Sequence, residues 1–188
     1  MQVFARDHVV VCGTDEVIAL IRQCAFHPET IEIHSLRDGE EVDEWETVMT
    51  IEGDYADFAH LETIYLGILA RQSRIATNVR RVVKAANGKP VLFFPARYDI
   101  YQTQESDGYA ALVGGIHGFS TDANALAAGG KGLGTIPHAL IASYKGDTVA
   151  ATEAFDKYVD PSIARIALVD FDNDCVNTSL AVARKLGK

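Results

Sequence analysis

The stretch Leu133-Gly134-Thr135-Ile136-Pro137-His138-Ala139-Leu140 decides how the rest of the chain is interpreted. It follows a glycine-rich run, predicted to be a flexible loop, and is expected to form a short buried strand that ends at a histidine. Two similar apolar segments, at 91–94 and 166–169, also change to charged residues at their carboxyl ends. Ligands bind at that edge of parallel α/β folds, so we expect a functional site there.

Strand and helix patterns alternate after Pro90. We predict strands at 91–94, 116–122, 135–139 and 166–169, and helices at 107–114, 123–128, 147–159 and 177–186. Apolar strands separated by helices are typical of a parallel sheet covered on both faces. A closed eight-strand barrel needs about 250 residues. The pattern therefore predicts a small open sheet or an incomplete barrel.

The first part of the chain has a different pattern of apolar and polar residues. It predicts strands at 2–12, 31–35 and 47–52, a helix at 17–25 capped by Thr14, and a long amphipathic helix over 55–86 that breaks near 73–78. Asn87-Gly88-Lys89-Pro90 ends that helix. We therefore expect an α/β protein with an N-terminal α+β sandwich-like domain over 1–88 and the first half of an α/β barrel with parallel strands over 89–188.

Composition excludes several classes of function. The 188 residues carry a net charge of −9, which argues against a nucleic-acid groove. Three cysteines without CxxC spacing argue against a disulfide framework or a structural zinc site. No run of about 18 apolar residues is present to span a membrane. We expect a soluble, cytoplasmic protein that acts on small molecules.

His138 is the first candidate catalytic residue. A neutral imidazole at a strand end could act as a general base or as a nucleophile towards a phosphoryl group. The alternative is a histidine packed under a helix with a structural role only.

Alternating carboxylates follow the last predicted strand, at Asp170, Asp172 and Asp174. They could hold Mg²⁺ together with a phosphate, or form an acidic turn in which Asp174 caps the next helix. A strand followed by DxD also opens one phosphatase superfamily, although Asp174 stands where that pattern has Thr.

Anion-binding side chains follow two earlier predicted strands. Arg97 could pair bidentately with a carboxylate or phosphate, or form a surface ion pair with Asp99. Ser120 and Thr121 could donate hydroxyl hydrogen bonds to an anion, or act as local caps.

Five stretches in this order make the chain resemble nicotinate phosphoribosyltransferase, a type II phosphoribosyltransferase. They are His60-Leu-Glu-Thr-Ile-Tyr-Leu-Gly67, Pro90-Val-Leu-Phe-Phe-Pro-Ala-Arg97, Gly114-Gly-Ile-His-Gly-Phe-Ser-Thr-Asp-Ala-Asn124, Gly132-Leu-Gly-Thr-Ile-Pro-His138 and Val169-Asp-Phe-Asp-Asn-Asp174. The resemblance covers nearly the whole chain. It implies a sandwich-like domain joined to an irregular barrel.

The resemblance also implies a reaction: transfer of ribose 5-phosphate from phosphoribosyl pyrophosphate to nicotinate in NAD salvage, with Mg²⁺ and coupled ATP hydrolysis through a phosphohistidine. His138 would be that histidine, and Asp170 and Asp172 would face the ribose and pyrophosphate. Arg97 would bind the carboxylate or a phosphate, with Ser120 and Thr121 at the base pocket.

Family members usually have a further N-terminal segment and further barrel strands, so the chain resembles a central segment of the family. The chain is expected to be inactive alone unless another chain completes the site. That chain could be a second copy, in a homo-oligomer such as a dimer, or a chain that supplies the missing half of the barrel. Two alternatives remain from the residues: a phosphohydrolase that uses Asp170 and Asp172, and a non-catalytic assembly subunit with an open sheet edge.

Overall fold

A computed structural model describes residues 1–187 of the chain. They fall into two compact units, Met1–Gly132 and Leu133–Lys188, called here the first and second unit. Among the described residues, no helix is both long enough and apolar enough to cross a membrane.

The first unit begins with an antiparallel sheet. Its strand order is β1 (Gln2–Phe4), β5 (Thr47–Glu52) and β3 (Glu32–Ser35). Two shorter strands, β2 (Val9–Val10) and β4 (Glu41–Val42), form a separate antiparallel pair. The expected α+β character is therefore confirmed, but the single strand predicted over 2–12 is two strands. They belong to different sheets.

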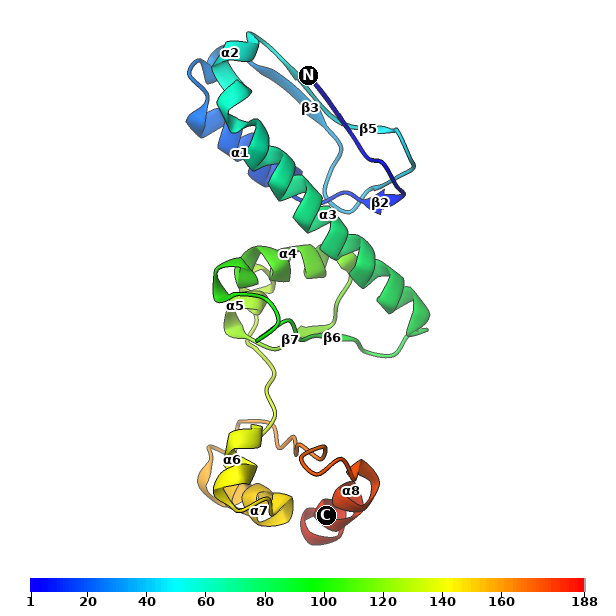
Figure 1. The fold of residues 1–188 in the computed structure, drawn as a ribbon, viewed down its shortest axis with the longest axis vertical. Helices are drawn as coiled ribbons and strands as arrows, with labels where there is room; N and C mark the ends of the chain where they lie inside the picture. Colours follow the sequence, from blue (N-terminus) through cyan, green and yellow to red (C-terminus); the bar gives the residue numbers. More distant parts are fainter. Residues whose placement is uncertain (188) are drawn as a thin grey trace. The chain divides into compact units, whose positions relative to one another are not determined.

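Helices α1 (Thr14–Cys24) and α3 (Glu62–Ala85) lie side by side and bury their apolar faces with the sheet (Figure 1). The prediction that Thr14 caps α1 is wrong. Gly13 takes the cap position with a left-handed φ of 96°, and the Thr14 hydroxyl donates to Asp38 Oδ1 at 2.8 Å. Glycine adopts that backbone conformation without steric cost.

Helix α3 is continuous, so the break predicted at 73–78 is wrong. A short helix α2 (Tyr55–Phe58) and a 3₁₀ turn precede it. The polar side chains that suggested a break hold β2 against the helix instead: Val10 N donates to Thr77 Oγ1 at 2.9 Å, and Cys12 N to Ser73 Oγ at 3.0 Å. Their polarity serves tertiary hydrogen bonds, and the helix backbone is unaffected.

A parallel pair of strands, β6 (Leu92–Phe93) and β7 (Gly118–Phe119), completes the first unit with α4 (Gln104–Gly114) and α5 (Asp122–Ala125). Helix α4 packs closely on α3, because a Cβ at Gly114 would lie 2.7 Å from Val79 Cβ. This packing explains why the first unit runs on to Gly132, beyond the domain boundary predicted at 88/89.

The second unit contains α6 (His138–Ser143), α7 (Thr148–Tyr158) and α8 (Cys175–Leu186). The strands predicted at 135–139 and 166–169 are not formed: a single hydrogen bond, Ile136 N to Ile166 O at 3.1 Å, joins the two segments. Pro137 has no N–H to extend a ladder. The α/β class is confirmed, but among the described residues only β6 and β7 pair in parallel.

Candidate functional site

The carboxyl ends of β6 and β7 lie next to each other in the first unit. Ser120 N donates to Phe93 O at 3.0 Å, so the last residue of β6 is joined to the first residue after β7. The loop 95–99 follows β6, and Ser120 and Thr121 follow β7. This edge is where open α/β sheets bind ligands.

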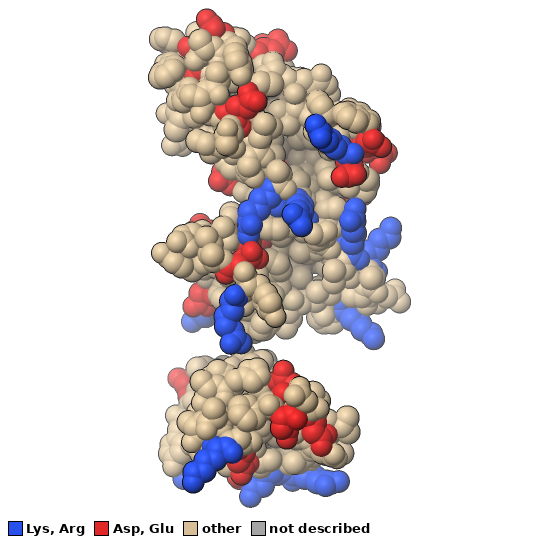
Figure 2. Space-filling view, in the orientation of Figure 1, with Lys and Arg blue, Asp and Glu red and all other residues tan. Residues whose placement is uncertain are grey.

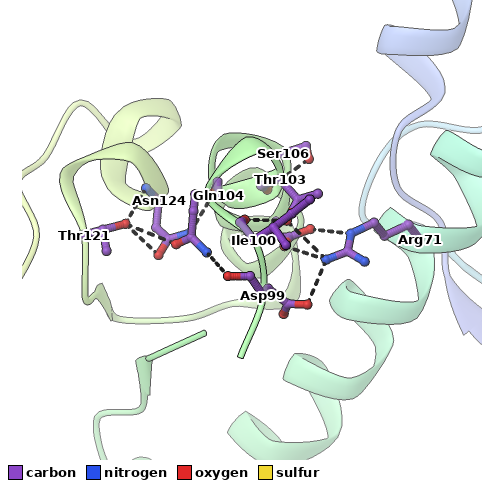
Figure 3. Close-up of polar contacts among 9 residues, drawn as sticks. Arg71, Asp99, Ile100, Thr103, Gln104, Ser106, Thr121 and Asn124 are labelled. Atoms are coloured by element: carbon purple, nitrogen blue, oxygen red, sulfur yellow. Dashed lines mark hydrogen bonds and ion pairs between the residues drawn. The ribbon is translucent and has the colours of Figure 1, made fainter. Parts of the chain in front are cut away.

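Two buried amides connect the loops at this edge (Figure 3). Gln104 accepts from Thr121 Oγ1 at 3.4 Å and donates to Asp99 O at 3.5 Å. Asn124, fully buried, donates to Gln104 O at 2.6 Å. The loop after β6 and the loop after β7 are therefore held by one hydrogen-bonded frame.

An ion pair attaches the same frame to α3. Arg71 Nε and Nη2 donate to the two carboxylate oxygens of Asp107, each at 2.8 Å, and the Asp107 side chain is fully buried. Arg71 Nη2 also lies 3.3 Å from Asp99 Oδ1 (Figure 3). These bonds, that to Asp107 first, raise the pKa of Arg71 above its usual range. The Arg71 guanidinium therefore stays protonated and is held in position by these bonds.

Arg97 lies in a strained turn of the loop 95–99. Its φ is 77°, which is unfavourable for a side chain with a Cβ, and Tyr98 N and Asp99 N both donate to Pro95 O. Its guanidinium forms no hydrogen bond or ion pair with residues 1–187. The alternative pairing of Arg97 with Asp99 is not present, because Asp99 pairs with Arg71.

The two hydroxyls after β7 have different surroundings. Ser120 Oγ is buried and has no hydrogen-bond partner within the described chain. Thr121 caps α5, since its Oγ1 accepts from Asn124 N at 3.1 Å. A buried hydroxyl without a partner is costly, and Ser120 is the hydroxyl of this pair that lacks a partner in the described chain.

The second unit brings His138 and Asp170 together. His138 is the first residue of α6, and its imidazole is 46% exposed with Nε2 3.5 Å from Asp170 Oδ1. The ring of Phe171 lies beside it, with 6.2 Å between centroids. The carboxylate can orient the imidazole, which remains accessible to a substrate.

Asp172 and Asp174 form a turn before α8. Asp172 Oδ1 accepts from Asp174 N at 3.2 Å and from Thr178 Oγ1 at 3.3 Å. Asp174 caps α8 by accepting from Asn177 Nδ2 at 2.8 Å and from Asn177 N at 3.2 Å. The side-chain bond first, and then the backbone bond, lower the pKa of Asp174. Of the two interpretations of this acidic stretch, the capping turn describes Asp174. Within residues 1–187, no three His, Cys, Asp or Glu side chains are arranged to hold a metal ion.

Sequence reasoning missed the residues that build the frame, namely Arg71, Asp107, Gln104 and Asn124. Asp107 gave the best signal, because it stands in a run of glycine and alanine that reads as a buried helix face. A carboxylate in such a place needs a cation. Nothing local in the sequence indicates that Arg71, 36 residues away, supplies it.

Comparison with known proteins bears on what this arrangement does. Residues 1–73 match the family model described as the N-terminal domain of quinolinate phosphoribosyl transferase. A solved nicotinate-nucleotide pyrophosphorylase from Pyrococcus furiosus is 36% identical, with a TM-score of 0.85 over 96% of this chain and 45% of that one. The chain is similar to pyridine phosphoribosyltransferases.

Two more distant structures share the fold. The nicotinate-nucleotide pyrophosphorylase from Ehrlichia chaffeensis is 20% identical, with a TM-score of 0.67 over 85% of this chain and 55% of that one. Human nicotinic acid phosphoribosyltransferase is 18% identical, with a TM-score of 0.65 over 79% and 36%. The chain thus spans about half or less of each. The resemblance to phosphoribosyltransferases is confirmed, but the matching family model is that of the quinolinate enzymes, so nicotinate phosphoribosyltransferase specifically is not established.

Proposed function

We propose that this chain is part of a phosphoribosyltransferase that forms nicotinate mononucleotide from phosphoribosyl pyrophosphate and a pyridine carboxylate in NAD biosynthesis. The observation that carries the proposal is the 36% identity over 96% of the chain to the Pyrococcus furiosus pyrophosphorylase. The free guanidinium of Arg97 and the unpartnered hydroxyl of Ser120 support it, since both suit an anionic substrate.

The reaction sets requirements that these residues can meet. The pyridine nitrogen forms a bond to ribose C1 while the C1–O bond to pyrophosphate breaks, and pyrophosphate leaves with the electron pair. Positive charge develops on the sugar, where a carboxylate is stabilising. Arg97 would hold the carboxylate of the pyridine in a bidentate pair.

Mg²⁺ enters this proposal with the substrate. The ion usually binds to substrate phosphates and one or two protein carboxylates, and it neutralises the charge of the leaving pyrophosphate. Asp170, which is exposed, would be available as such a carboxylate, whereas Asp172 is already engaged by Asp174 and Thr178. That engagement also leaves the phosphohydrolase alternative without a specific observation in its favour.

Two pyridine carboxylates, quinolinate and nicotinate, are candidates for the substrate. The match to the quinolinate family favours quinolinate, whose conversion to nicotinate mononucleotide must release one carboxyl group as CO₂. The motifs around His138 favour nicotinate with coupled ATP hydrolysis, in which the imidazole attacks the γ-phosphorus, ADP leaves, and water later hydrolyses the phosphohistidine. The exposed imidazole beside Asp170 is compatible with that step.

Product analysis separates these routes. The protein is incubated with phosphoribosyl pyrophosphate, Mg²⁺ and either carboxyl-labelled quinolinate or nicotinate plus γ-labelled ATP. Release of labelled CO₂ supports the quinolinate route. Acid-labile phosphate on the protein, absent in His138→Ala, supports the nicotinate route. The assay is repeated with a chain that supplies the missing half of the barrel. If neither acid binds and no mononucleotide forms under either condition, the proposal is wrong.

A substitution at Arg97 tests the proposed binding of the pyridine carboxylate without destabilising the fold. Arg97→Gly removes the guanidinium and also the strain of the left-handed backbone. We expect binding of the pyridine carboxylate to weaken by roughly 10- to 100-fold, the value of a charge-assisted bond, while the melting temperature stays the same or rises. Arg37→Gln, in a turn far along the sequence, is the charge-matched control. Equal affinity in the two variants contradicts the role of Arg97.

A further inference from the structure

A groove of about 750 Å³ lies in the first unit between the segment 3–9 and helix α3. It exists because β1 pairs with β5 whereas β2 pairs with β4 and is fastened to α3 through Thr77 and Ser73. The connection from β1 to β2 therefore spans an opening beside the helix. None of the residues at the ends of β6 and β7 lines it.

Three arginines surround this groove: Arg6 from the connection, and Arg74 and Arg81 from α3. None of their guanidinium groups forms a hydrogen bond or ion pair with residues 1–187, although the chain has 26 acidic against 17 basic residues. Asp7 is the single carboxylate among the lining residues, and the lining His8 already pairs with Asp43 at 2.9 Å. Figure 2 shows Lys and Arg side chains gathered over α3.

Apolar side chains make up part of the lining, which is called here the floor. Val3, Val9, Val48, Leu66 and Leu69 line it, and Leu66 keeps 40% of its surface exposed. Its volume is in the range of small-molecule sites. A groove with unpaired guanidinium groups around an apolar floor fits a ligand that has an anionic head and an apolar body.

We propose that this groove is a second binding site, separate from the ends of β6 and β7, for a small organic phosphate. The phosphate group lies between the guanidinium groups of Arg6, Arg74 and Arg81, which present planar pairs of donors to its oxygens. The apolar body of the ligand covers the floor around Leu66.

Phenyl phosphate and inorganic phosphate are suitable probes for the full chain. Titration followed by amide chemical shifts is expected to show saturable binding of phenyl phosphate, with shifts confined to 3–9 and to α3. Inorganic phosphate is expected to bind several-fold more weakly, because it leaves the apolar floor uncovered. Arg74→Gln and Arg81→Gln are each expected to weaken phenyl phosphate about tenfold, as for loss of one charge-assisted hydrogen bond.

Two controls make the result decisive. Arg37→Gln removes a guanidinium of the same unit that does not line the groove, and it is expected to leave the affinity unchanged. Arg97→Gly is expected to leave it unchanged as well, so that failure at one site is distinguished from failure at the other. Equal weakening by Arg37→Gln and Arg74→Gln would mean general charge attraction and overturn the proposal, as would the absence of saturable binding.

Discussion

Replacing Arg71 by methionine leaves a buried carboxylate without its cation. The Asp107 side chain is fully buried and receives two hydrogen bonds of 2.8 Å from Arg71. Breaking a buried pair in this way costs about 3–5 kcal/mol. Because the Arg71 side chain itself is 43% exposed, we expect the low end, about 3 kcal/mol. That is a large share of the 5–15 kcal/mol that stabilises a typical domain.

A double-mutant cycle measures the pair itself. In Arg71→Met with Asp107→Leu, no buried charge is left unpaired, so we expect about 2 kcal/mol to be regained relative to Arg71→Met alone. The free energy of unfolding is measured by urea denaturation at pH 7.

Asp99 provides the matched control because it shares the same arginine at 3.3 Å but its side chain is 45% exposed. Asp99→Asn is expected to cost less than about 1 kcal/mol, as exposed ion pairs do. If Arg71→Met costs no more than Asp99→Asn, or if the two sites of the cycle are additive, burial of Asp107 does not have the role described here.

Three further outcomes test local parts of the fold. Gly67→Ala should stabilise α3 by up to about 1 kcal/mol, since nothing lies near the added Cβ. Gly114→Ala should instead destabilise the protein by about 1–3 kcal/mol, because the added Cβ would contact Val79. Thermal unfolding of the two variants measures the difference. Burial raises the pKa of Cys12 to about 12, so the contribution of this thiol to stability should be constant below about pH 9 and should be lost as pH rises from 9 towards 12. Urea unfolding should show a weaker fall in Cys12→Ala. Asp174→Ala should fray the start of α8, seen as faster amide exchange at Asn177. Because hydrogen bonds hold the pKa of Asp174 below its ordinary value, the wild type should fray in the same way as pH falls through that lowered pKa.

Local signals predicted most helices and the three-stranded antiparallel sheet of the first unit, but they did not predict β4 or the separation of β1 from β2. The alternation over 47–52 and the apolar spacing of 62–85 correspond to β5 and α3, because one face of each is buried against the same core. These patterns depend only on near neighbours in the sequence. They succeed wherever burial on one face determines the element.

The segment 135–139 shows where such patterns fail. Ile136 is fully buried, as predicted, but it packs with Ile141 and Ala151 in a cluster of helices. A short apolar run indicates burial and does not distinguish a strand from an irregular segment. A strand also needs partners that supply a ladder, and here one hydrogen bond to Ile166 is formed.

The candidate site residues also divide into those that a local pattern indicated and those that only tertiary contacts reveal. Arg97, Ser120 and the His138–Asp170 pair could be proposed because each follows an apolar segment, whether or not that segment is a strand. The buried frame of Gln104 and Asn124 could not, since its hydrogen bonds join loops that are far apart in the sequence.

Gly132 illustrates how packing decides the meaning of a motif. The glycine-rich run suggested a flexible loop, with close approach to a ligand as the second interpretation. A Cβ at Gly132 would lie 2.6 Å from the backbone carbon of Thr121, and Gly132 N donates to Asp122 Oδ1 at 2.8 Å. The close approach is therefore to the chain's own backbone, directly after β7. Because any side chain at this position would displace Thr121, the absence of a side chain lets the loop pack directly against Thr121 and Asp122.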